Sequence, residues 1–366
     1  MSEMSEFLPP ADEIMDDEPA LHDEQLSPEE IAQLYSEIDE AQDALLTVRD
    51  FIRFVVSKLR QYDVVVAQGT TDDFAEAAAI VLHSLSLEWE ASPEILDCRL
   101  TGSEKQAVLT LLAERIILRK PLSYLINLAY FCNLPFYVDE RVLIPRSPIA
   151  ELINQKFYPY FDVDTADKSG FFAHGLPELQ LSPPERILDL CTGSGCIAIA
   201  LAKAFPDANV DGVDIDKDAL EVAWTNVEHH ELTHQVNLLE SDLFDKLPAE
   251  NQYELIVTNP PYVDAAVMAE LPPEFLHEPE HALAAGQDGL DLVHQILYRA
   301  SDYLTRDGLL VCEVGDSEWA LRQAYPEIQF DWLNFAKGGS GIFAITQEEL
   351  LEYRDEFARH LTNQGE

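Results

Sequence analysis

The stretch Ile187-Leu-Asp-Leu-Cys-Thr-Gly-Ser-Gly-Cys-Ile-Ala-Ile-Ala200 decides the fold of this 366-residue chain. Its first four residues predict a buried parallel strand, and apolar residues at helical spacing follow a tight turn at Gly193 and Gly195. Many α/β proteins bind nucleotide-like cofactors with a strand, a glycine turn and a helix, because glycine lets the backbone approach the ligand. The stretch is close to Asp-x-Gly-x-Gly-x-Gly, with Cys191 in the place of the first glycine. An ordinary turn between strand and helix is the alternative interpretation.

Around this stretch, residues 185–366 alternate between strand and helix patterns. The last two strands are joined by Gly338-Gly-Ser-Gly341, which indicates a hairpin. We therefore predict an α/β, Rossmann-like domain with a seven-stranded, mostly parallel sheet and an antiparallel strand at one edge. The strands are expected at about 186–190, 210–214, 236–240, 254–258, 308–314, 330–335 and 342–346, and the helices at about 195–205, 217–231, 288–305, 317–324 and 347–361.

The chain before this domain has a different pattern. Residues 1–26 are acidic and aperiodic, which predicts a disordered extension. Residues 27–121 predict a small helical domain, because capping sequences such as Ser27-Pro-Glu-Glu30 precede amphipathic stretches. Residues 122–158 predict a β-hairpin and a linker helix, and residues 159–184 predict a loop.

The charge is strongly negative, with a formal net of −45. Residues 1–43 hold 15 acidic side chains and no Lys or Arg, yet the remainder still has a net charge of −30. An acidic surface can attract a basic partner, or it can reflect adaptation to a salty cell interior. In either case, extended contact with nucleic acid is unfavourable without a local basic groove, and no basic run that would form one is present.

Composition also bears on location and metal binding. No run reaches the roughly 18 apolar residues that span a bilayer, and the N-terminus lacks a signal-peptide pattern, so we expect a cytoplasmic protein without membrane contact. The five cysteines include no Cys-x-x-Cys pair, so neither a disulfide framework nor a zinc site is expected. His277, Glu278 and His281 could suggest a metal, but a loop beside the substrate is the favoured interpretation.

The carboxyl ends of the strands are where ligands bind in such sheets. Asp189 ends the first strand, and Asp214 ends the second, 25 residues later, where an acidic residue accepts hydrogen bonds from ribose hydroxyls. A helix cap is the alternative for Asp214, although Asp216 already suits that role. After the third strand, Asp242 could hold an adenine amino group beside an apolar residue, or it could be a loop residue.

The fourth strand runs into Asn259-Pro-Pro-Tyr262, the most specific signal in the chain. The prolines stiffen the turn and carry no amide donors. The Asn259 side-chain oxygen and the Pro260 carbonyl can therefore accept hydrogen bonds from one planar NH2 group, and Tyr262 can stack on its face.

Together these motifs resemble S-adenosylmethionine-dependent methyltransferases that modify planar nitrogens, and above all the HemK-like protein N(5)-glutamine methyltransferases. Members of that family have a helical N-terminal domain for substrate recognition, a β-hairpin linker and a catalytic domain. The stretch 136–153, with Arg146-Ser-Pro-Ile149, and the turn Cys191-Thr-Gly-Ser-Gly-Cys196 are similar to the branch that modifies ribosomal protein uL3. The resemblance covers about residues 47–350.

The resemblance implies S-adenosylmethionine as cofactor and the amide of a glutamine in uL3, a basic protein, as substrate. It implies catalytic roles for Asn259, Pro260 and Tyr262, which orient the amide lone pair toward the methyl group without a dedicated base. The implied cofactor residues are Asp189, Thr192, Gly193, Gly195, Asp214, Ile215, Asp242, Leu243 and Asn259, and the implied substrate residues are Asn259, Pro260, Pro261, Tyr262, Pro145 and Arg146.

Several alternatives remain open at this point. Arg146 could instead pair with a carboxylate, and the aromatic residues Trp319, Trp332 and Phe335 are expected in the core. The substrate could be a release factor, or adenine N(6) in a nucleic acid, which the charge argues against. A non-catalytic ribosome-assembly factor or a nicotinamide-dependent oxidoreductase would fit the motifs less well.

Overall fold

The computed structural model describes residues 26–70, 72–163, 181–336 and 338–363. The chain forms two compact units, one from Met1–Val65 and Asp73–Lys120 and the other from Val66–Asp72 and Pro121–Glu366. Residues 1–25 of the predicted acidic extension and most of the loop predicted for 159–184 lie outside the described residues.

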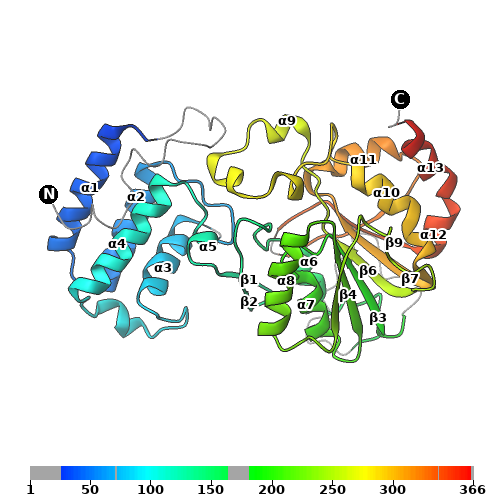
Figure 1. The fold of residues 1–366 in the computed structure, drawn as a ribbon, viewed down its shortest axis with the longest axis horizontal. Coiled ribbons are helices and arrows are strands. Elements are labelled where there is room, and N and C mark those ends of the chain that lie inside the picture. Colours follow the sequence, from blue (N-terminus) through cyan, green and yellow to red (C-terminus); the bar gives the residue numbers. More distant parts are fainter. Residues whose placement is uncertain (1–25, 71, 164–180, 337, 364–366) are drawn as a thin grey trace. The chain divides into compact units, whose positions relative to one another are not determined.

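The first unit is helical (Figure 1). Three of its helices begin with a capping box, in which a Ser or Thr side chain and an acidic residue three positions later satisfy each other's backbone amides. Apolar residues such as Leu34, Phe51 and Val81 are fully buried between the helices. The buried Arg115 guanidinium pairs with Glu76 at 2.7 Å and donates to the Val65 carbonyl. The helices are α1 (Pro28–Ala44), α2 (Val48–Gln61), α3 (Asp73–Ser84) and α4 (Gly102–Ile117).

The second unit contains the seven-stranded sheet in the order β5-β4-β3-β6-β7-β9-β8, which confirms the predicted fold class. The first five of these strands are parallel, and β9 is antiparallel to both of its neighbours. The chain order reverses beside β3, so a crevice is expected outside the carboxyl ends of β3 and β6. The strands are β3 (Arg186–Leu190), β4 (Asn209–Asp214), β5 (Val236–Glu240), β6 (Tyr253–Thr258), β7 (Leu304–Glu313), β8 (Asp331–Trp332) and β9 (Ile342–Thr346).

Alternate residues of the longer strands supply two separate cores. On β3, Ile187 packs into one apolar cluster, whereas Leu188 and Leu190 pack into the other. The first cluster includes helices α6 (Ile149–Asn154), α7 (Cys196–Ala204) and α8 (Lys217–His229). The second includes α10 (Asp291–Arg299), α11 (Glu318–Ala324), α12 (Gln347–Glu352) and α13 (Arg354–Asn363). Figure 1 shows these two helical layers on opposite sides of the sheet.

The remaining elements lie before β3 or between β6 and β7. The short helix α5 (Leu122–Leu125) precedes the hairpin of β1 (Ala129–Phe131) and β2 (Leu134–Phe136). Cys132 and Asn133 form the hairpin turn with φ of 49° and 60°, as a two-residue turn between twisted strands requires. The segment after β6 carries α9 (Ala265–Met268) and two short 3-10 turns.

Some predicted elements differ in the structure. The short helix α5 occupies the start of the region that was predicted to hold the hairpin. Strand β7 begins at Leu304 rather than near 308, because an irregularity in its pairing with β6 lets the strand continue across Gly308. Trp319, which was expected in the core, is 72% exposed, so that prediction was wrong. Its neighbour Leu321 is the residue of α11 that is fully buried.

No helix in the described parts of the chain is long and apolar enough to cross a membrane.

Candidate active site at the carboxyl ends of the strands

The glycine turn after β3 has a left-handed backbone at three alternate positions. Cys191, Gly193 and Gly195 have φ of 62°, 52° and 78°. The Cβ that any other residue would carry at position 195 would lie 3.2 Å from that of Ala223 on α8, so this position is close to the helix as well as left-handed. Cys191 therefore adopts a left-handed conformation that favours glycine, at some cost in strain.

Buried hydrogen bonds to Asp189 hold this turn against the end of β3. Its Oδ2 accepts hydrogen bonds from the Thr192 hydroxyl at 2.6 Å and from the Ala198 amide at 3.0 Å. The side chain is fully buried, and burial raises the pKa of Asp189 to about 7. In the structure, Asp189 therefore orders the turn and the first turn of α7.

Asp214 supports the turn from the next strand. Its two carboxylate oxygens accept from the Gly193 amide at 2.8 Å and from the Asp216 amide at 3.0 Å. Asp216 caps α8 through the Asp218 amide, so the capping role belongs to Asp216. Burial raises the pKa of Asp214. A carboxylate has about four acceptor positions, so Asp214 keeps two for a ligand.

Three residues flank Asp214 at the same edge of the sheet. Ile215 is a large apolar side chain with 61% of its surface exposed. Leu243 is buried with φ of 44°, and Asp242 before it is exposed. The Ser241 amide donates to the Asp214 carbonyl at 2.8 Å, which joins the ends of β4 and β5.

Asn259-Pro-Pro-Tyr262 follows β6 directly, on the neighbour of β3. The Thr258 hydroxyl donates to the Leu190 carbonyl at 2.9 Å, which holds the ends of these two strands together. The Asn259 Oδ1 atom is buried and has no hydrogen-bond partner in the described structure. A buried carbonyl oxygen without a donor is unfavourable, so this atom is a candidate acceptor for an N–H group of a ligand.

Tyr262 is held in place by Glu313 at the end of β7. The tyrosine hydroxyl donates to Glu313 Oε1 at 3.1 Å, and the Ser147 hydroxyl donates to the other oxygen of that carboxylate. Burial raises the pKa of Glu313 to about 7. Sequence reasoning missed Glu313, although a carboxylate at the end of a buried parallel strand was the available signal.

Replacement of Glu313 by Gln should stabilise the protein increasingly as the pH rises. In the folded protein the Glu313 carboxyl keeps its proton up to about pH 7, whereas in the unfolded chain it ionises near 4.5. Protonation of Glu313 therefore favours the folded state fully below pH 4.5, and this stabilisation is lost as the pH rises to about 7. Glutamine is neutral and can still bond Tyr262 and Ser147. We expect its advantage in the free energy of unfolding to grow by about 2 kcal/mol between about pH 5.5 and pH 8, measured by urea denaturation.

The exposed Glu250 provides the matched control, because Glu250→Gln removes a carboxylate in contact with water. If the free energy of unfolding depended on pH in the same way in Glu313→Gln and Glu250→Gln, Glu313 would be ionised in the folded protein at neutral pH.

Arg146 is paired with Glu278, which is the alternative that the sequence left open. Its guanidinium makes two hydrogen bonds of 2.6 Å and 2.8 Å to the Glu278 carboxylate. Glu278 also accepts from the Ile144 amide and the Gln68 side chain, so four hydrogen bonds reach one fully buried carboxylate. The neighbouring Pro145 is buried. This network ties the 142–147 segment to the loop after β6.

The loop after β6 shows no metal centre. His281 lies 3.0 Å from Asp216, and Glu278 is occupied by Arg146. Within the described ranges no group of three or more His, Cys, Asp or Glu side chains is arranged to hold a metal ion.

Comparison with known proteins shows what this chain is similar to. Residues 161–295 match the family model described as "Methyltransferase small domain". The chain is 41% identical over 317 residues to the ribosomal protein uL3 glutamine methyltransferase of Francisella tularensis, covering 86% of this chain and 95% of that protein. It is 42% identical over 313 residues to the protein of the same name from Neisseria meningitidis, covering 86% and 97%.

A solved structure that resembles this chain is more distant from it than these two proteins. A methyltransferase from Pyrococcus furiosus is 17% identical, with a TM-score of 0.38 and coverage of 58% of this chain and 88% of that one.

Proposed function

Since this chain belongs to the family of ribosomal protein uL3 glutamine methyltransferases, we propose that it methylates the side-chain amide nitrogen N(5) of a glutamine in uL3. It is an S-adenosylmethionine-dependent protein methyltransferase. The observation that carries the proposed substrate chemistry is the buried Asn259 Oδ1 atom, which lacks a donor. An amide NH2 group supplies such a donor, and its second N–H can bond the Pro260 carbonyl.

The proposed mechanism depends on orientation. An amide nitrogen is a poor nucleophile because its lone pair is delocalised into the carbonyl group. Asn259 and Pro260 hold the two N–H bonds, so the lone pair can point at the methyl group, and Tyr262 packs on the amide face. Positive charge develops on the nitrogen as it bonds the methyl carbon, and the two acceptors therefore bind the transition state more tightly than the ground state. The nitrogen then loses one of its two N–H protons to solvent, which leaves a neutral N-methyl amide. S-adenosylmethionine supplies an activated methyl group on a cationic sulfur.

The residues around the glycine turn fit S-adenosylmethionine. A Cβ at Gly193 would meet no atom within 4 Å, so this position leaves space for the methionine end, and the unused acceptor positions of Asp214 suit the ribose hydroxyls. Ile215 and Leu243 can pack on the adenine ring, and Asp242 can accept from its amino group. In this proposal Asp189 and Thr192 order the turn, as their hydrogen bond indicates.

Replacement of Asp214 by Ala should weaken the binding of S-adenosylmethionine about 10- to 100-fold, because hydrogen bonds to a charged group are lost. Calorimetric titration measures this change. Asp218→Ala is the matched control, since Asp218 is an exposed acid in the first turn of α8. If both variants bound S-adenosylmethionine with equal affinity, Asp214 would not bind the ribose.

The substrate is tested by incubating the protein with labelled S-adenosylmethionine and purified uL3, release factor or DNA. We expect label on uL3. Label on the release factor alone would indicate a release-factor glutamine methyltransferase. Label on DNA alone would contradict the proposal.

We also propose that the protein works in the cytoplasm, where ribosomal proteins are made, and that the helical unit recognises the substrate. A net charge of −45 suits a basic protein partner.

A further inference from the structure

The turn after β7, Gly315–Ser317, contacts Tyr262 directly. A Cβ at Gly315 would lie 2.5 Å from the tyrosine ring, so only glycine lets the two approach this closely. The Ser317 hydroxyl donates to the Tyr262 carbonyl at 2.9 Å. The side chains that the turn Gly315–Ser317 exposes are therefore held in a fixed position beside Asn259-Pro-Pro-Tyr262.

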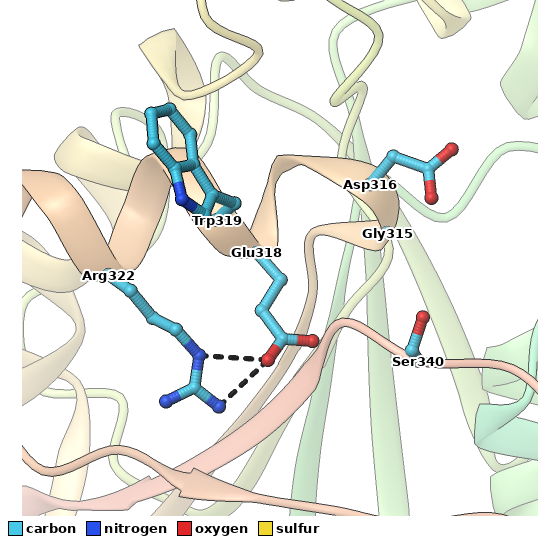
Figure 2. A pocket seen from close by; sticks show the side chains of 6 residues that line it. All are labelled: Gly315, Asp316, Glu318, Trp319, Arg322 and Ser340. Atoms are coloured by element: carbon cyan, nitrogen blue, oxygen red, sulfur yellow. Dashed lines mark hydrogen bonds and ion pairs between the residues drawn. The ribbon is translucent and has the colours of Figure 1, made fainter.

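This turn and α11 present a surface cavity of about 280 Å³ (Figure 2). Trp319 stands on one side of it with 72% of its surface exposed, which is the largest exposed fraction among the described large hydrophobic residues. Asp316 and Ser340 lie on the other side in the same view. The full lining consists of Gly315, Asp316, Glu318, Trp319, Arg322 and Ser340.

One carboxylate in the cavity, that of Asp316, has no positively charged partner within the described part of the chain. The Arg322 guanidinium bonds the Glu318 carboxylate at 2.7 Å and 2.8 Å, and it lies over the Trp332 ring at 4.4 Å. This pair is neutral as a whole. The Asp316 side chain makes no hydrogen bond or ion pair with the residues that the structure describes. The cavity therefore combines an exposed indole face with one uncompensated negative charge.

An indole face and a carboxylate together match a single cation. Lysine and arginine side chains bind the face of tryptophan, and a carboxylate adds a charge-assisted hydrogen bond. We propose that this cavity is a specificity subsite, which binds one Lys or Arg side chain of the substrate protein near the target glutamine. The inference rests on the proposed function, because it assigns the substrate's neighbouring residues to a surface next to Tyr262.

The test compares the kinetics of uL3 methylation for Trp319→Leu, Trp319→Phe and Asp316→Asn. Removal of the indole or of the charge should raise KM for uL3 about fivefold, with kcat and the affinity for S-adenosylmethionine unchanged. Trp319→Phe keeps an aromatic face and should fall between the wild type and Trp319→Leu. The matched control is Trp224→Leu, because Trp224 is 45% exposed on α8, outside the cavity lining, and its loss should leave KM unchanged.

Two results would overturn the subsite. Unchanged KM in both Trp319→Leu and Asp316→Asn would show that uL3 does not use the cavity. A raised KM in Trp319→Leu alone would show an apolar contact in place of a cation.

A wild-type protein that leaves uL3 unlabelled would refute the proposed function rather than the subsite. The subsite would then be tested by NMR with N-acetylarginine amide as the probe. The indole N–H signal of Trp319, assigned by its loss in Trp319→Phe, should shift on titration in the wild type and should shift less in Asp316→Asn. An unshifted signal in the wild type would refute the cation site.

Discussion

Replacement of Asn259 by Ala should lower the rate of methyl transfer on the order of 10³-fold and leave the binding of S-adenosylmethionine nearly unchanged. The Asn259 Oδ1 atom is a buried acceptor without a hydrogen-bond donor in the described structure. Without it, the glutamine amide loses one of its two anchors, and the lone pair is no longer held toward the methyl group. Single-turnover methylation of uL3 measures the chemical step, and calorimetry measures the binding of the cofactor.

The exposed Asn237 on β5 offers the control, because Asn237→Ala removes the same group away from the proposed site. If Asn259→Ala lost cofactor affinity and transfer rate to the same extent, Asn259 would be a cofactor residue rather than an amide acceptor.

Replacement of Glu278 by Ala should lower the free energy of unfolding by about 3 to 5 kcal/mol. The Glu278 carboxylate is fully buried and receives hydrogen bonds from Arg146, Ile144 and Gln68. Its removal leaves the guanidinium largely buried without its counter-ion, and this is the main cost. Urea denaturation followed by circular dichroism measures the change.

Glu280→Ala is the matched control, since Glu280 is an exposed acid of the same loop. The double replacement of Arg146 and Glu278 by Met should recover part of the loss, because it removes both charges. Equal stability of the Glu278→Ala and Glu280→Ala variants would mean that the network contributes little.

The sequence predicted the sheet because its signals are local. The apolar strands and the turns after them lie within a few residues of each other, and Asn259-Pro-Pro-Tyr262 is contiguous. The network around Glu278 could not be predicted in this way, because its partners are 132 to 210 positions distant along the chain. Glu313 meets Ser147 and Tyr262 through the same kind of long-range contact.

Trp319 shows a different limit. Its aromatic side chain suggested the core, but a short helix places only some residues inward, and Leu321 takes that position on α11. The experiments above test the predicted roles of Asp214 and Asn259 in the site.

The hydrogen bonds of Glu313 also order events during synthesis of the chain. Asn259 to Tyr262 leave the ribosome about 50 residues before Glu313, which orients the tyrosine. Gly341, whose carbonyl accepts from the Val314 amide at 2.7 Å, follows later still. The turn Asn259-Pro-Pro-Tyr262 therefore gains the contacts that orient it only after β7 and β9 have been synthesised. A chain interrupted before residue 313 would contain every residue of the Asn-Pro-Pro-Tyr motif and lack the support that orients it.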